Sequence, residues 1–150
     1  CEIMKDDGTM ARMDDIKAFP REHDDAETWS DTGVELFLNV SCDRLNYYHL
    51  VINFNGNITD YTALKAGSGY AKGDTKWNSG ATAKVERRGG GYVITVSVPL
   101  KSLGTVPDEF PVEVCRSRVT KSGEGYCLYH WSPYAKDWDE VRAFGTISFR

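Results

Sequence analysis

One stretch of the sequence decides the fold class, and it reads Tyr47-Tyr48-His49-Leu50-Val51-Ile52-Asn53-Phe54-Asn55-Gly56. Its side chains alternate, so an extended chain places Tyr48, Leu50, Ile52 and Phe54 on one face. The Asn-Gly pair that follows is a tight-turn signal and ends the segment. The pattern therefore predicts a long β-strand with one strongly apolar face.

Similar short runs recur along the chain, separated by turn residues. We expect strands at 34–38, 47–54, 82–88, 92–98, 112–119, 126–131 and 144–149. Residues 1–23 read as a loop-rich opening segment, and residues 59–80 as a polar surface loop. The chain shows no convincing helical period. The pattern therefore predicts an all-β chain that forms a two-sheet antiparallel β-sandwich of immunoglobulin-like or jelly-roll type, as a single domain over 1–150.

Composition narrows the classes of partner. The net charge is −4 at pH 7, which argues against nucleic acid and anionic membranes as ligands. No apolar run approaches the roughly 20 residues that span a bilayer. The sequence starts at Cys1 without a start methionine, so we expect a fragment or a processed form.

The four cysteines are too few to define a disulfide scaffold, but they can add single bridges. Cys115 and Cys127 flank a polar, glycine-containing turn at 121–125 and would face each other if the flanking segments pair as a hairpin. Two buried free thiols are the alternative. A bridge between Cys1 and Cys42 rests on weaker grounds.

No catalytic constellation stands out. The chain has three histidines and lacks the Gly-x-Ser-x-Gly elbow of a serine hydrolase. Glycoside hydrolysis needs two carboxylates across a cleft, and no acidic pair stands out from the rest of this acidic chain. We therefore expect a protein that is not an enzyme.

Aromatic and charged side chains point instead to a binding function. All four tryptophans lie at loops or strand edges, where an indole can stack on the C–H face of a sugar ring. Packing is the alternative for each of them, most of all for Trp77. Glu35 lies opposite Val34, Leu36 and Leu38 by alternation, so its face is solvated or its carboxylate has a partner.

Two arginines show a similar pattern. Arg116 and Arg118 share one face of the strand expected at 112–119, where their side chains can fork onto sugar hydroxyls or pair with a carboxylate. A structural ion pair with Glu35 or another acid is the alternative that this pattern leaves open.

Several stretches, taken in order, resemble a known family. They are 29–38 (WSDTGVELFL), 47–53 (YYHLVIN), 91–100 (GYVITVSVPL) with Leu103-Gly104, 114–118 (VCRSR), 131–133 (WSP) and 144–147 (FGTI). In this order and spacing they resemble the family 9 carbohydrate-binding modules and their wider relatives, over most of the chain from about residue 24. The family's usual opening strands are absent from this sequence.

The resemblance implies a secreted, extracellular, bacterial domain that binds an oligosaccharide or polysaccharide without cleaving it, next to an attached glycoside hydrolase that degrades polysaccharide. Two tryptophans would clamp a terminal sugar. The implied site residues are Trp29, Glu35, Asn53 or His49, Arg116 or Arg118, and Trp131, with Trp138 in the same segment as Trp131. Calcium accompanies some such modules. Asp14, Asp15, Asp24 and Asp25 offer oxygen ligands for it, and a solvated acidic loop is the alternative.

Two other functions compete with glycan binding. The first is a structural or adhesive sandwich with a degenerate sugar site, which binds a protein through an edge strand. The second is a haem-binding electron-transfer domain, since related sandwiches hold haem. Its axial ligands would come from Met4, Met10, Met13, His23, His49 or His130, and the sequence lacks a Cys-x-x-Cys-His attachment motif.

Overall fold

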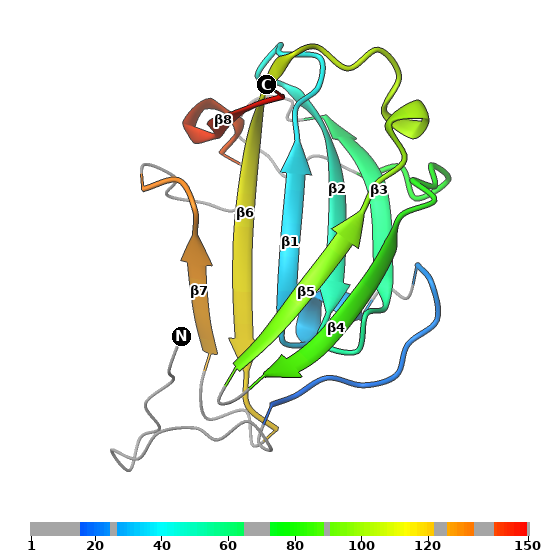
Figure 1. The fold of residues 1–150 in the computed structure, drawn as a ribbon, viewed down its shortest axis with the longest axis vertical. Helices are drawn as coiled ribbons and strands as arrows, with labels where there is room; N and C mark the ends of the chain where they lie inside the picture. Colours follow the sequence, from blue (N-terminus) through cyan, green and yellow to red (C-terminus); the bar gives the residue numbers. More distant parts are fainter. Residues whose placement is uncertain are drawn as a thin grey trace.

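The computed structural model describes residues 16–24, 27–64, 73–88, 91–121, 126–133 and 140–149. The regular elements in these ranges are strands and short 3₁₀ helices (Figure 1). In chain order they are η2 (Thr28–Ser30), β1 (Gly33–Leu38), β2 (Asn46–Asn53), β3 (Ile58–Leu64), β4 (Thr82–Arg88), β5 (Gly91–Ser97), η3 (Leu100–Leu103), β6 (Glu109–Val119), β7 (Tyr126–His130), η4 (Val141–Ala143) and β8 (Gly145–Ser148).

The strands form two antiparallel sheets, so the predicted all-β two-sheet fold is confirmed. The main sheet has the order β3-β2-β1-β6-β7, and β8 pairs with the first part of β6. The second sheet is the β4–β5 hairpin. β6 is long enough to pair with β8 over Glu109–Val112 and with β7 over Cys115–Val119, which leaves Glu113 and Val114 between the two partners.

Alternation along the strands gives the main sheet two different faces. We call the face toward β4 and β5 the front face and the other the back face. Leu50, Ile52 and Ile58 are buried on the front face, against apolar side chains of β4 and β5 such as Ile94 and Val96. This layer is the sandwich core that the alternation in 47–54 predicts.

The back face has its own apolar cluster. Phe37, Tyr47 and Cys115 project from the sheet and pack with Val141 and Phe144 from the segment around η4. Arg44 holds that segment in place, because its guanidinium donates hydrogen bonds to the carbonyls of Val141 and Phe144 at 3.2 and 3.0 Å. Polar groups of β1, β2 and β6 are buried beside this cluster.

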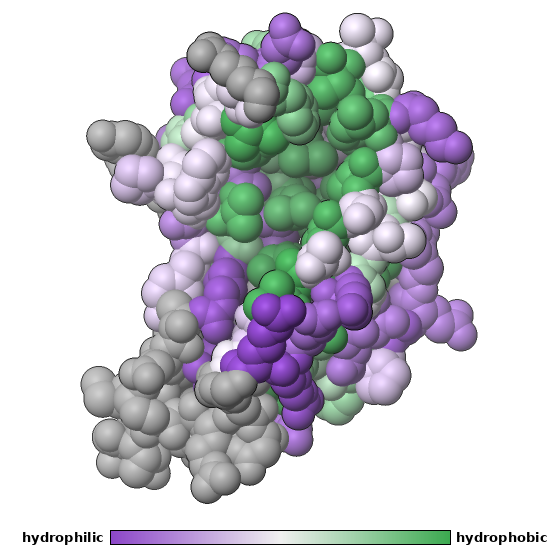
Figure 2. Space-filling model, in the orientation of Figure 1, coloured by the Kyte–Doolittle hydropathy of each residue, from purple (hydrophilic) through white to green (hydrophobic). Residues whose placement is uncertain are grey.

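The second sheet is narrower than the first. Figure 1 shows β4 and β5 crossing in front of β1, β2 and β3, while β7 and the upper part of β6 lie beside the hairpin. Val114 on β6 and Tyr129 on β7 remain 37% and 40% exposed on the front face. Figure 2 shows apolar side chains gathered over the centre and the upper part of this face.

One strand was missed by the sequence analysis. Residues 59–64, expected to begin a surface loop, instead belong to β3, which pairs with β2 from Asn46↔Leu64 to Ile52↔Ile58. The strand carries Asp60 and Thr62 on its front side, and these polar residues mask its alternation. Asp60 is tolerated there because its buried carboxylate accepts hydrogen bonds from the backbone and hydroxyl of Ser79.

Candidate functional site

The predicted site residues separate onto the two faces of the main sheet. Glu35 pairs in register with Cys115, whereas Arg116 pairs with Val34, so the arginine and Glu35 project to opposite faces. Arg118 lies two residues beyond Arg116 and shares its front face. The structure therefore does not form the ion pair between Glu35 and an arginine that the sequence left open.

Glu35 instead has a histidine as its partner on the back face. Its Oε2 lies 2.8 Å from Nε2 of His49, and both side chains are buried. The imidazole stacks on the ring of Phe37, with 4.0 Å between ring centroids, and meets the ring of Tyr61 edge-on. The mid-strand carboxylate is thus partnered, which is one of the two explanations that the sequence offered.

Asn53 is occupied by structural hydrogen bonds. Its Nδ2 donates to the Phe19 carbonyl and to Oδ2 of Asp31, both at 3.0 Å. Its Oδ1 accepts from the backbone of Asn55 and Asn57, which fixes the turn after β2. Since both ends of this buried amide are used, Asn53 organises the turn and the Asp31 contact.

Trp29 lies on η2, on the back-face side of the sheet. The preceding residue, Thr28, is buried, and its hydroxyl hydrogen-bonds the hydroxyl of Thr59 at 2.9 Å. Thr59 is in register with Val51, which pairs with Glu35, so it projects from the back face. The Trp29 side chain is itself 60% exposed.

Trp131 lies on the front face, directly after β7. Its backbone N–H donates to the Val114 carbonyl at 2.9 Å, and its ring lies over Gly145 at the start of β8. Gly145 pairs with Val112, whose side chain belongs to the front-face core. Trp131 is 51% exposed, and the sheet separates it from Trp29, so the two indoles do not form one clamp. Trp138 lies outside the described residues.

Trp131 belongs to an open front surface that sequence reasoning only partly found. We define it by Val114, Arg116, Tyr129 and Trp131. Tyr129 is in register with Arg116, so the ring and the guanidinium project side by side. The missed residue was Tyr129, although its position two before Trp131 on an expected strand was a usable signal.

Tyr92 of β5 fixes the arginine in this surface. Nε of Arg116 donates to the Tyr92 hydroxyl at 3.0 Å, and the guanidinium carbon lies 5.4 Å from the centroid of that ring. Burial raises the pKa of Tyr92, and the positive charge of Arg118 offsets part of that rise. The phenol therefore stays protonated at neutral pH and accepts the arginine's hydrogen bond through its oxygen.

A separate hollow of about 570 Å³ lies along the other edge of the main sheet. Tyr47, Tyr48 and Thr62 line it on one side, and Leu103 to Thr105 on the other. Tyr48 also packs against Trp77, whose Nε1 donates to the Ser102 carbonyl at 3.3 Å. Trp77 is half-buried in this packing, as the sequence analysis expected.

The acidic residues proposed for calcium are only partly described. Oδ2 of Asp24 lies 2.9 Å from Nδ1 of His23, and its Oδ1 accepts the Asp60 N–H at 3.2 Å. These three side chains bring ligand atoms together, with Asp60 buried and the other two exposed. Asp14, Asp15 and Asp25 lie outside the described residues, so calcium binding here stays a prediction.

The proposed disulfide between Cys115 and Cys127 is wrong. Cys115 is a buried free thiol and pairs with His130, while the partner of Cys127 in the register is Arg118. The β6–β7 hairpin is thus shifted by three residues from the register that a bridge would need. Cys42 is also a free thiol and is exposed, so it does not pair with Cys1.

The histidines considered as haem ligands lie in three different settings. His23 is beside Asp24, His49 is bonded to Glu35, and His130 lies against Cys115. Met4, Met10 and Met13 lie outside the described residues, and haem binding stays an untested alternative.

Comparison with known proteins gives a fold but no family. No protein-family model and no curated protein matches the chain. One similar crystal structure is that of a "putative carbohydrate-binding protein" from Bacteroides uniformis, with a TM-score of 0.63 and 16% identity, covering 90% of this chain and 68% of that one. At this identity the likeness shows a shared fold. Within the described residues, no helix is long and apolar enough to cross a membrane.

Proposed function

We propose that this chain is a carbohydrate-binding β-sandwich module that holds a glycan on its open front surface. The observation that carries the proposal is the juxtaposition of two exposed aromatic rings, Trp131 and Tyr129, with Arg116 on one face of the sheet. An aromatic ring stacks on the C–H face of a pyranose, and a guanidinium donates to its hydroxyls.

The proposal is for binding without cleavage. Two rings and a guanidinium can hold and orient a sugar, but none of them is suited to donate or accept the proton that glycoside hydrolysis requires at neutral pH. In this role the module would be secreted and would bring an attached or partner glycoside hydrolase to polysaccharide. The name of the Bacteroides uniformis structure and the resemblance to family 9 modules support this proposal.

The same proposal departs from the family pattern in one respect. The family places its ligand between two tryptophans and beside the carboxylate that matches Glu35, whereas Glu35 here is buried against His49. We therefore place the glycan on the Trp131 side of the sheet. Stacking on two rings and a few hydrogen bonds corresponds to micromolar to millimolar affinity, or about −4 to −8 kcal/mol.

The experiment begins with an array of plant, microbial and host glycans and continues with calorimetric titration of the best ligand. We expect Trp131→Ala to weaken binding by about tenfold or more, since a stacked ring contributes on the order of 1 kcal/mol beyond its buried area. Trp29→Ala is the matched control, because Trp29 is also more than half exposed but lies on the back-face side.

Each outcome of this experiment has a distinct meaning. Loss of binding in Trp131→Ala with an unchanged Trp29→Ala supports the front surface. The reverse result would place the sugar on the back face, as in the family pattern. A folded protein that binds no glycan on the array would favour the structural or adhesive alternative.

A further inference from the structure

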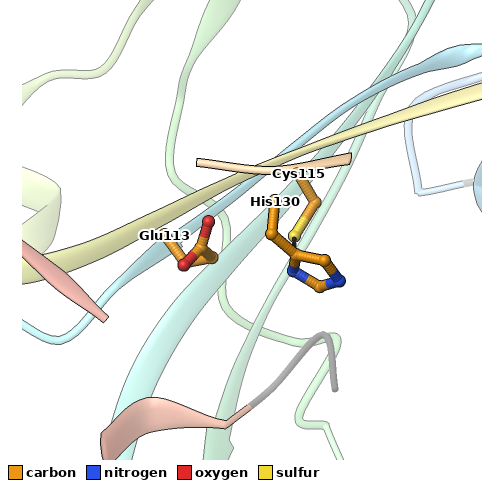
Figure 3. A group of neighbouring side chains, drawn as sticks. All are labelled: Glu113, Cys115 and His130. Carbon is orange, nitrogen blue, oxygen red and sulfur yellow. Dashed lines mark hydrogen bonds between the residues drawn. The ribbon is translucent and has the colours of Figure 1, made fainter. Parts of the chain in front are cut away.

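Three metal-ligating side chains of different chemistry meet on the back face, away from the proposed sugar surface. Glu113 and Cys115 project two residues apart from β6, and His130 projects from the position on β7 directly opposite Cys115. Figure 3 shows the sulfur and the imidazole side by side, with the Glu113 carboxylate next to them. The Sγ–Nδ1 distance is 3.3 Å, and the ligand atoms of all three residues lie within 4.8 Å of one another.

The cluster is built into the sheet. Glu113 and Cys115 are fully buried, and His130 is half-buried. The carboxylate of Glu113 is oriented by the backbone N–H groups of Ser132 and Val114, at 3.0 and 3.2 Å. Such hydrogen bonds to a ligating carboxylate are typical of the outer shell of a metal site.

Two buried acidic side chains lie close to the sulfur. Glu113 projects beside Cys115 on the same face of β6. Glu35 is the cross-strand neighbour of Cys115, and its buried Oε1 has no hydrogen-bond partner among the described residues. A divalent ion bound at the sulfur would offset the negative charge that Glu113 and Glu35 place near it.

We propose that Glu113, Cys115 and His130 form a binding site for a divalent transition metal ion, with zinc as the ion that best fits a sulfur, nitrogen and oxygen donor set. Zn–S and Zn–N bonds of about 2.3 and 2.0 Å in a tetrahedron separate the two donors by about 3.5 Å. The observed 3.3 Å is close to that value. Calcium and magnesium are disfavoured because they select oxygen donors.

Binding requires a small adjustment and the loss of a proton. The Glu113 oxygen moves about 1 Å toward the ion to reach bonding distance. The Cys115 thiol releases its proton to solvent as the Zn–S bond forms, so affinity rises with pH. His130 is the one ligand of the three that is not fully buried, so we expect the ion to enter beside it and a solvent molecule to be the fourth ligand.

The test uses the full chain with Cys42→Ser, which removes the exposed thiol as a competing ligand. Titration with Co²⁺ should give one bound ion per chain and a near-ultraviolet sulfur-to-cobalt charge-transfer band, which Zn²⁺ then displaces. Adding Cys115→Ser should abolish the band, and His130→Gln should weaken binding by at least tenfold. His23→Gln is the matched control, because His23 belongs to the other cluster of candidate ligands, and it should change neither result.

Folding is checked separately so that a lost site is not confused with a lost fold. Each variant should keep the circular dichroism of the parent, and Zn²⁺ should raise the unfolding temperature of Cys42→Ser but not that of Cys42→Ser/His130→Gln. Binding that survives Cys115→Ser, a band that depends on another cysteine, or the absence of any bound Co²⁺ would overturn the proposal.

Discussion

The indole of Trp131 rests directly on the backbone of Gly145. A Cβ built on Gly145 would lie 2.7 Å from Cζ3 of the indole, closer than real Cβ contacts, and 3.0 Å from Cη2. Glycine at this position therefore lets the six-membered ring lie against β8 while the rest of the indole stays exposed. The orientation of the proposed sugar platform depends on the absence of one methyl group.

The first prediction follows from this contact. Gly145→Ala should push the Trp131 ring away from β8 and weaken glycan binding several-fold without removing any ligand-contacting group. The displacement should also change the tryptophan emission spectrum. Gly104→Ala is unsuitable as a control because of its positive φ, so we choose Thr146→Ala on the neighbouring exposed position of β8. Equal affinity in the parent and Gly145→Ala would show that the ring orientation does not matter.

Tyr129 gives a second prediction that separates its ring from its hydroxyl. Tyr129→Ala should lower glycan affinity by about fivefold to tenfold, because a stacking surface of about 1 kcal/mol is lost. Tyr129→Phe keeps the ring and should stay within about twofold of the parent. Calorimetric titration measures both. A large loss in Tyr129→Phe would mean that the hydroxyl, rather than the ring, contacts the sugar.

The sequence correctly predicted which side chains of one strand share a face of the sheet, because this depends only on their alternation along the strand. The side chains of Leu50 and Ile52 lie on the buried front face, and Glu35 lies on the face opposite Val34 and Leu36, as the period-two pattern implies. Each of these statements concerns a single strand, where local geometry is sufficient.

What the sequence could not supply was the register between distant strands. Arg116 was correctly placed on the face of Val114, but only the pairing of β1 with β6 shows that this face is opposite to that of Glu35. Likewise, the register of the β6–β7 hairpin separates Cys115 from Cys127. A shift of one residue in the pairing of two strands moves a side chain to the other face of the sheet. The composition of the turn alone does not determine the register of the hairpin.

A third prediction concerns the buried pair of Glu35 and His49. Glu35→Ala leaves the imidazole without its partner in the interior, and we expect a loss of about 3 kcal/mol in the free energy of unfolding. Urea denaturation measures it, and Thr95→Ala, an exposed position on β5, should stay within about 0.5 kcal/mol of the parent. A double-mutant cycle with Glu35→Gln and His49→Gln should give a favourable coupling, and a coupling near zero would contradict the pair's importance.

The fourth prediction concerns the loss of stability at low pH, and it depends on Asp43. Burial raises the pKa of this carboxyl, but hydrogen bonds from Asn46, Leu45 and Asn39 lower it by more, so the pKa lies well below its ordinary value. A depressed pKa contributes stability above the unfolded-state value of about 3.9, and this contribution is lost as the pH falls further.

Asp43→Asn removes that contribution. The variant should be less stable than the parent by a constant amount between about pH 5 and 7, and the difference should shrink as the pH falls below about 4. Urea denaturation at a series of pH values measures the two curves. A constant difference down to the lowest accessible pH would show that Asp43 does not carry this part of the acid sensitivity.

The last prediction distinguishes Cys42 and Cys115 by their reactivity. Cys42 is exposed, whereas Cys115 is buried with a raised pKa, first because of burial and then because of the charges of Glu113 and Glu35. Alkylation requires the thiolate and access to it. Iodoacetamide at about pH 8 should therefore modify Cys42 in the native protein and leave Cys115 unmodified, and both should react after unfolding in urea. Peptide mass spectrometry without reductant measures this. Rapid modification of Cys115 in the native protein would contradict a buried free thiol, and so would its recovery in a disulfide-linked peptide with Cys127. Either result would also contradict the proposed metal site, which depends on that thiol.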